Sequence, residues 1–200
     1  ARASRRPLEI TSTSQLPPQD RQEDFNPDTK GVSNLVEVRV VEDELRNILR
    51  GWASHPMGDL RVLVLSPYTA QRRLLDAAVR RVRATIRRPQ QTHYKYTVDV
   101  ATVDGSQGAS VDCVFLSLAR SIPRDDQQTR SRMMRFTGDR RRMNVMLSRA
   151  EAHLHVVGDM DYVAHSNTPW DAWWAGVLSG RWGGADLVHV GNVPAGGRAH

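Results

Sequence analysis

The sequence predicts an α/β domain in which helices cover both faces of a parallel sheet. Two observations lead to this fold class. Apolar runs of strand length, such as 62–65 and 111–118, are nearly continuous, which is typical of strands that are buried on both faces. Amphipathic helical patterns separate these runs, and such alternation indicates parallel strands joined by helical crossovers.

The first helix is predicted over residues 34–50, and its apolar residues recur at helical spacing. They are Leu35, Val38, Val41, Leu45, Ile48 and Leu49. Asn34 followed by Glu37 resembles a capping box, in which the two side chains satisfy each other's backbone amides. Gly51 is suited to end the helix. The next strand, 62–65, breaks at Pro67, and a second helix is predicted over 69–88.

The second half of the chain continues the alternation. Apolar strands are predicted around 98–103 and 111–118, and a helix over 140–150 leads into a strand over 153–158. Thr168 and Pro169 then supply a cap and a first-turn proline for one more helix. Its tryptophans are interpreted as packing against the sheet, with stacking on nucleic-acid bases as the alternative. They are Trp170, Trp173 and Trp174.

Composition divides the chain into one domain with polar ends. Residues 1–32 are rich in polar residues and are expected to form a flexible linker or tail, followed by the domain over 33–182. Residues 183–200 are rich in glycine and are expected to form a flexible tail, while 121–137 are expected to form a mobile polar loop.

The net charge is +6, and nearly all of the cations are arginines. This excess favours a polyanionic partner, and arginine favours bidentate phosphate contacts. Cys113 is the single cysteine, so an internal disulfide is excluded and a reducing compartment is expected, cytoplasmic or nuclear. No apolar run approaches the ~20 residues of a membrane span, and we expect an intracellular protein without a membrane partner.

A polar loop with two glycines, Asp104-Gly105-Ser106-Gln107-Gly108, connects two of the predicted strands. Glycine lets a backbone approach phosphate closely or adopt positive φ. Two further blocks lie at junctions of a strand and a helix. In 62–72 a strand is followed by the start of a helix, and 140–150 is a helix that leads into a strand. The three blocks resemble motifs IV, V and VI of superfamily 1 helicases, in particular the branch containing the nonsense-mediated-decay RNA helicase and its DNA-processing relatives. Their order and spacing are similar to those of the second, carboxy-terminal RecA-like domain, over roughly residues 33–165.

This resemblance implies a RecA-like fold and an ATP site shared between two domains. It implies that Arg149 contacts the γ-phosphate, where a guanidinium stabilises the charge of phosphoryl transfer, and that Arg72 is a second such contact. Further nucleotide contacts are implied for Gln71, Tyr68, Gly108, Ser110 and Arg142. Coupling and nucleic-acid contacts are implied for Thr102, Asp104, Gln107, Ser66 and Pro67. The chain departs from the family pattern at Ser106, where an aromatic residue is usual, and at Ser110, where a glutamate is usual.

Two features of an ATP site are missing from the sequence. It contains no G-x-x-x-x-G-K-[ST] phosphate loop, and no acidic pair follows a strand to hold magnesium. ATP and Mg²⁺ are therefore expected to be held mainly by a first RecA-like domain outside this chain, with single-stranded RNA or DNA as the other partner. The alternative is a non-enzymatic module that binds nucleic acid or protein. His153 and His155 alternate on one strand, but no cysteine or carboxylate pattern accompanies them, so no metal site is predicted.

Overall fold

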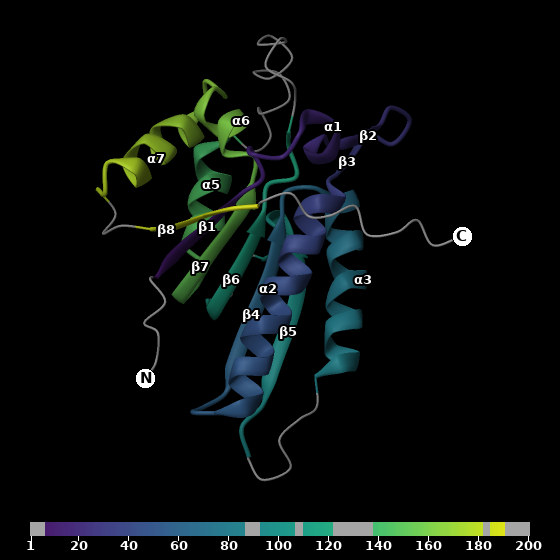
Figure 1. The fold of residues 1–200 in the computed structure, drawn as a ribbon, viewed down its shortest axis with the longest axis vertical. Helices are drawn as coiled ribbons and strands as arrows, with labels where there is room; N and C mark the ends of the chain where they lie inside the picture. Colours follow the sequence, from purple (N-terminus) through teal and green to yellow (C-terminus); the bar gives the residue numbers. More distant parts are fainter. Residues whose placement is uncertain (1–6, 87–92, 107–109, 122–137, 182–184, 191–200) are drawn as a thin grey trace.

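The computed structural model describes residues 7–86, 93–106, 110–121, 138–181 and 185–190. Its main element is a six-stranded sheet in the order β5-β4-β6-β7-β1-β8, and every pair of neighbours is parallel (Figure 1). The strands are β1 (Leu8–Ser12), β4 (Leu60–Ser66), β5 (Tyr96–Thr102), β6 (Val111–Ser117), β7 (Ala150–Gly158) and β8 (Asp186–His189). Because all of these strands run in the same direction, the sheet has one carboxyl edge and one amino edge.

Helices cover both faces of the sheet, which confirms the predicted fold class. One face packs against α2 (Leu35–Ser54) and α3 (Thr69–Thr85), with a core that includes Val64 and Phe115. The other face packs against α5 (Arg140–Leu147), α6 (Met160–Ala164) and α7 (Pro169–Leu178), with a core that includes Leu65 and Leu116. Neighbouring residues of one strand therefore enter different cores, which explains the continuous apolar runs.

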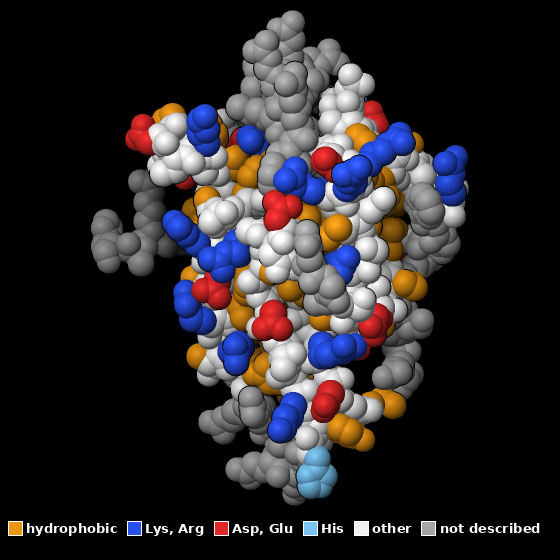
Figure 2. Space-filling model, turned by 180° about the vertical axis from the view of Figure 1, so that it is seen from behind, with side chains coloured by type: hydrophobic (Ala, Val, Ile, Leu, Met, Phe, Trp, Pro, Cys, Tyr) orange, Lys and Arg blue, Asp and Glu red, His pale blue; other side chains and the backbone are white. Residues whose placement is uncertain are grey.

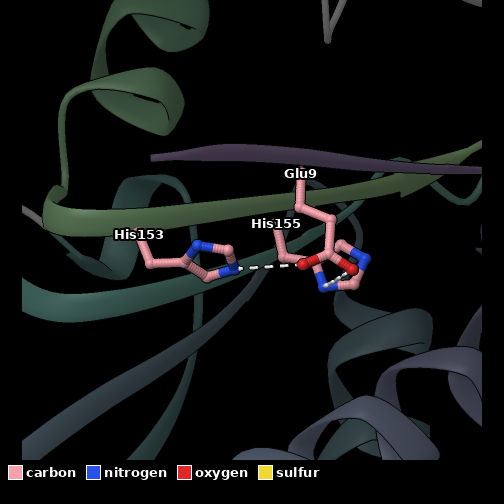
Figure 3. Close-up of side chains that lie close together, drawn as sticks. All are labelled: Glu9, His153 and His155. Atoms are coloured by element: carbon pink, nitrogen blue, oxygen red, sulfur yellow. Dashed lines mark ion pairs between the residues drawn. The ribbon is translucent and has the colours of Figure 1, made fainter. Parts of the chain in front are cut away.

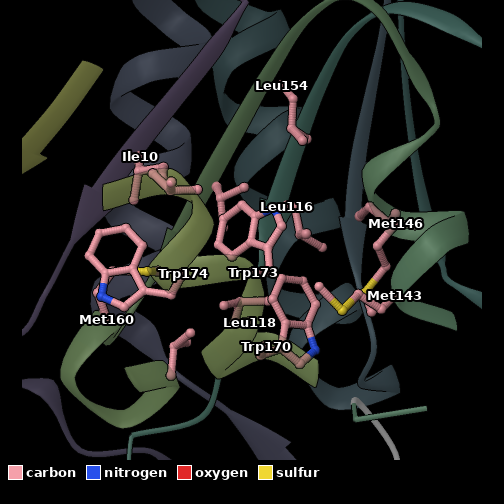
Figure 4. Close-up of a cluster of buried hydrophobic side chains, with 14 of the residues drawn as sticks. Ile10, Leu116, Leu118, Met143, Met146, Leu154, Met160, Trp170, Trp173 and Trp174 are labelled. Atoms are coloured by element: carbon pink, nitrogen blue, oxygen red, sulfur yellow. The ribbon is translucent and has the colours of Figure 1, made fainter. Parts of the chain in front are cut away.

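The three tryptophans of α7 lie in the second of these cores, as predicted (Figure 4). Trp170 is completely buried, and its ring centroid lies 5.4 Å from that of Trp173 in an edge-to-face arrangement. The hydroxyl of Thr168 accepts a hydrogen bond from the backbone amide of Trp170, so the predicted cap is present. These rings pack against the sheet, and the stacking alternative is wrong.

Helix α2 begins as predicted but ends later. The Asn34 side chain accepts hydrogen bonds from the amides of Val36 and Glu37, both at 3.1 Å. The helix passes Gly51 and continues to Ser54, because Trp52 in its last turn packs edge-on against Tyr96 at 5.4 Å. Tertiary packing thus outweighs the helix-ending preference of glycine.

The prediction that residues 1–32 form a flexible linker is wrong for the part that the structure describes. β1 lies in the sheet between β7 and β8, and α1 (Pro18–Arg21) follows it. A two-stranded antiparallel ribbon is formed by β2 (Asp24–Asn26) and β3 (Gly31–Ser33). β1 was missed because it is five residues long and gains its stability from β7 and β8 rather than from its own pattern.

The predicted tail over 183–200 is likewise wrong for β8, which pairs with β1. The remainder of that tail, 191–200, and the predicted polar loop beyond Ser121 lie outside the described residues. Among the helices that the structure describes, none has the length and apolar character needed to cross a membrane.

Candidate functional site

The carboxyl edge of the sheet gathers the residues that follow β4, β5 and β6. Ser66 and Thr102 end β4 and β5 and are register partners, and Ser117 ends β6. The side chains of Ser66 and Pro67 are buried, and the Ser66 hydroxyl accepts a bond from the Tyr68 amide at 3.4 Å. Neither side chain is available for the predicted contact with nucleic acid, whereas Thr102 is half-exposed.

A buried polar network lies directly beneath this edge. Glu37, in the first turn of α2, accepts hydrogen bonds from the Ser117 hydroxyl at 2.6 Å and from the Ala119 amide at 2.8 Å. Burial raises the pKa of the Glu37 carboxyl to about 8, against the lowering effect of those two donors. Ala119 itself has a φ of 63°, a left-handed conformation that is uncommon for alanine.

Gln71 belongs to the same network, which corrects its predicted role as a nucleotide contact. Its side chain is fully buried. Its amide oxygen accepts a bond from the Asn34 backbone amide at 2.8 Å, and its nitrogen donates to the Asn34 carbonyl and to the Ser117 hydroxyl. With its donors and acceptor engaged inside the protein, Gln71 joins α2, α3 and β6 and does not face a ligand.

The side chain of Tyr68 packs against Arg120, an arginine that was not predicted from the sequence as a site residue. The Arg120 guanidinium lies 5.0 Å from the centroid of the Tyr68 ring and donates to the tyrosine hydroxyl at 3.0 Å. Arg120 also forms a buried ion pair with Glu23, whose carboxylate accepts the Ser121 amide at 3.0 Å. Burial raises the pKa of Glu23, opposed by the charge of Arg120. The ring of Tyr68, for which a nucleotide contact was predicted, therefore packs on Arg120.

Asp104 and Arg142 form an ion pair between the segment after β5 and the first turn of α5. The Arg142 Nε lies 3.1 Å from an Asp104 carboxylate oxygen. Asp139 caps α5 by accepting the amides of Arg141 and Arg142, and these bonds hold the pKa of its carboxyl below the usual value. Gln107 and Gly108, which were also predicted to act here, lie outside the described residues.

Arg149 lies at the opposite, amino edge of the sheet. Its carbonyl accepts the Val111 amide at 3.0 Å, so it is adjacent in space to Ser110 at the start of β6. Its half-buried side chain donates from Nε to the Val145 carbonyl at 3.2 Å, along the end of α5. The structure thus places Arg149 close to Ser110, and both were predicted to contact the nucleotide.

Arg61 completes the charge pattern at the amino edge. It donates to the Ser110 carbonyl at 3.1 Å and forms ion pairs with Asp112 at 3.1 Å and Glu151 at 3.0 Å. Hydrogen bonding from Arg61 lowers the pKa of the Asp112 carboxyl. Arg61 was not predicted as a site residue, because one arginine in a strand has no motif to distinguish it.

Arg72 and Arg149 do not lie together. Arg72 follows the carboxyl end of β4, whereas Arg149 is level with its amino end, since Val62 pairs with Cys113 and Val111 pairs with Ala150. β4 has seven residues, so its ends are ~20 Å apart at about 3.3 Å per residue. The prediction that both arginines contact one γ-phosphate is therefore not retained.

Comparison with known proteins agrees with this architecture. A family model described as "AAA domain" matches residues 3–161. Helicase sen1 of Schizosaccharomyces pombe is 30% identical over 50% of this chain and 5% of its own length. The helicase required for RNAi-mediated heterochromatin assembly 1, from the same yeast, is 34% identical over 55% of the chain and 10% of its length. The DNA polymerase alpha-associated DNA helicase A of Saccharomyces cerevisiae is 26% identical over 70% of the chain and 18% of its length.

The chain therefore spans less than a fifth of the length of each of these relatives. The family match nevertheless covers most of the chain and includes β1, which the structure places inside the sheet. The parallel six-stranded sheet with helices on both faces is the RecA-like fold. The chain belongs to the AAA domain family found in superfamily 1 helicases, in the branch related to the nonsense-mediated-decay helicase and its DNA-processing relatives.

Proposed function

We propose that this chain is the second motor domain of an ATP-dependent superfamily 1 nucleic-acid helicase. The observation that carries the proposal is the separation of two sets of residues on opposite edges of one sheet. Arg149 and Ser110 lie at the amino edge, and Thr102 and Arg72 at the carboxyl edge. The segment from Val103 to Ser110 connects the two edges, because it leaves β5 at one and enters β6 at the other.

The amino edge fits the terminal phosphate of ATP. A half-buried guanidinium at Arg149 and an exposed hydroxyl residue, Ser110, suit an anionic, oxygen-rich group. Bound ATP would supply the phosphoryl group whose transfer develops negative charge, and we assign the stabilisation of that charge to Arg149. The two carboxylates that the structure describes beside Ser110, Asp112 and Glu151, are both paired with Arg61, and we assign Mg²⁺, together with the phosphate loop, to the first RecA-like domain.

The carboxyl edge is assigned to the single strand of nucleic acid. Arg72 and Thr102 are half-exposed there, and Thr69 is exposed at the start of α3. Arginines, hydroxyls and backbone amides hold phosphates without reading bases, as a translocating motor requires. Basic side chains on the face shown in Figure 2 are interspersed with acidic ones and do not form one continuous patch. On this face, the charged side chains do not provide one continuous basic surface for a polyanion.

The names of the relatives support a nucleic-acid substrate, because each is called a helicase and one a DNA helicase. The proposed cycle is closure of two domains on ATP, sensed by Arg149, and reopening after hydrolysis. Movement at the amino edge would reach the nucleic acid through the segment from Val103 to Ser110. That segment is anchored to α5 by the ion pair between Asp104 and Arg142.

The test is ATP turnover by this chain when it is joined to a phosphate-loop RecA-like domain. We expect Arg149→Ala to lower kcat by about 10³-fold or more, the range known for arginine fingers, with little change in nucleic-acid affinity. Arg149→Lys should restore little, since an ammonium lacks the planar fork. Arg83, an exposed residue of α3, provides the matched control.

If Arg149→Ala and Arg83→Ala have the same turnover, Arg149 is a surface charge and the proposal fails. If no phosphate-loop domain is encoded upstream, the alternative of a non-enzymatic module holds instead. The serine at position 106 is consistent with either outcome. It is buried and donates to the Val103 carbonyl at 2.8 Å, so it closes a short 3₁₀ turn, η1 (Asp104–Ser106).

A further inference from the structure

Three potential metal ligands meet on the sheet face that α2 and α3 cover. Glu9 lies on β1 and is the register partner of His155 on β7, and His153 lies two residues earlier on the same strand (Figure 3). The alternation of β7 places both imidazoles on one face. The ring of His155 packs on Phe115 with a centroid distance of 5.3 Å, which identifies the face.

The distances within this cluster suit a shared cation. Nε2 of His153 lies 3.6 Å from one Glu9 carboxylate oxygen, and Nδ1 of His155 lies 3.8 Å from the other. The potential ligand atoms of the three residues all lie within 4.8 Å of one another. Ligands at 2.0–2.2 Å from a tetrahedral metal are roughly 3.3–3.6 Å apart. A small rotation of the side chains therefore gives a coordination sphere.

A fourth residue contacts the buried imidazole at its other ring nitrogen. His155 is completely buried, and its Nε2 lies 2.8 Å from the Thr11 hydroxyl. When Nε2–H donates to Thr11, the lone pair of Nδ1 points toward Glu9. Histidine ligands of metals generally donate their second ring nitrogen to such an orienting partner.

The cluster is shielded but accessible. The side chains of Glu9 and His153 are 14% and 12% exposed. A cavity of about 400 Å³ reaches His153 and is also lined by Asn47, Asp112 and Cys113. Of the three residues of the cluster, His153 alone lines this cavity, so solvent approaches the cluster from the His153 side. Water completes the coordination in open three-ligand sites.

We propose that Glu9, His153 and His155 bind one divalent transition-metal ion, for which Zn²⁺ is the probe. Two imidazoles and one carboxylate are a ligand set for zinc and its neighbours, whereas Mg²⁺ prefers oxygen ligands only. The site is separate from the Mg²⁺ expected with ATP. Its effect is structural, because the ion joins β1 to β7 and so secures the amino-terminal segment in the sheet.

Binding is tested on the tag-free chain by titration with Zn²⁺ against a chromogenic chelator. We expect one tight site per chain and a rise in Tm with Zn²⁺ that Mg²⁺ does not reproduce. His153→Gln and Glu9→Gln should abolish this site. The matched control is His55→Gln, since His55 is an exposed residue after α2 and lies outside the cluster.

Thr11→Val probes the orienting hydrogen bond and should weaken Zn²⁺ affinity about 10–100-fold. Circular dichroism verifies that each variant is folded; His153 is preferred over the buried His155 for this reason. Substitution with Co²⁺ should produce a visible ligand-field spectrum that is lost in His153→Gln. The proposal is overturned if folded His153→Gln keeps the wild-type affinity, or if the wild-type chain binds no Zn²⁺.

Discussion

A side-chain carboxyl oxygen of Glu37 accepts a 2.6 Å hydrogen bond from the hydroxyl of Ser117, which links the first turn of α2 to the carboxyl end of β6. Both residues are completely buried. The neutral carboxyl is favoured at this position because burial penalises the charged form, and the pKa rises to about 8. A titratable group therefore lies under the edge that we assign to nucleic acid.

The first prediction concerns the pH dependence of folding. Between the ordinary carboxyl pKa of 4.5 and the raised value of about 8, the folded protein binds more protons at Glu37 than the unfolded chain does. This contribution to stability is complete below the unfolded pKa and is lost as pH rises toward 8. Chemical denaturation of the wild-type chain between pH 5 and 8 should show a falling free energy of unfolding.

Glu37→Gln is the control, because the amide keeps the shape of the side chain and does not titrate. The difference in stability between wild type and variant should change steadily over this pH range. A constant difference would show that Glu37 is not protonated in the folded protein.

The second prediction concerns Gln71. Gln71→Leu removes the partners of the Asn34 backbone and of the Ser117 hydroxyl, which are buried. An orphaned buried polar group costs about 1–3 kcal/mol. Urea unfolding should show a loss of at least this size, whereas Arg73→Ala, an exposed change on the same helix, should have almost no effect. Equal stability of the two variants would contradict the structural role of Gln71.

The third prediction compares two glycines. A Cβ at Gly158 would lie 3.0 Å from Cδ1 and 3.2 Å from Cβ of Leu118, so Gly158→Ala should destabilise the fold by about 1–3 kcal/mol. Gly51, inside α2, has open space around the same position, and Gly51→Ala should stabilise by up to ~1 kcal/mol. Thermal unfolding of both variants measures the contrast, and shifts of the same sign would refute it.

The fourth prediction is that the isolated chain does not hydrolyse ATP. The sequence has no phosphate loop and no acidic pair for magnesium, and phosphoryl transfer needs both positioning and charge neutralisation. Phosphate release by the purified chain should equal the background rate. Turnover that disappears in Arg149→Ala would show a complete site within these 200 residues.

The fifth prediction is weak and salt-sensitive binding of single-stranded nucleic acid. Each phosphate that an arginine neutralises releases counterions. For single strands, the slope of the logarithm of the binding constant against the logarithm of the salt concentration is roughly −0.7 per neutralised phosphate. Fluorescence anisotropy with labelled RNA and DNA should show affinity that falls as salt increases. Arg72→Ala should reduce the slope, while Arg83→Ala should not. Affinity that is independent of salt would contradict the proposal that side chains at the carboxyl edge bind the phosphates of a single strand.

The sequence by itself determined the fold class and the order of the main elements. Continuous apolar runs, helical periodicity and the cap at Asn34 are local signals, and they are sufficient for β4, β6, α2 and α3. The three motifs also indicated the family, because their order along the chain needs no coordinates. These features depend on neighbours in the sequence, which is why they could be predicted.

Only the tertiary structure decided the parts that depend on distant residues. β1 and β8 are short strands stabilised by the sheet they join, so their own composition resembled a linker. Glu37 appeared to belong to a capping box, yet its carboxylate bonds to Ser117, 80 residues away. Glu9 reaches His153 and His155 only through strand pairing across the chain. The pairing between strands determines which residues lie at the same edge of the sheet. It places Arg72 near the carboxyl edge and Arg149 at the amino edge.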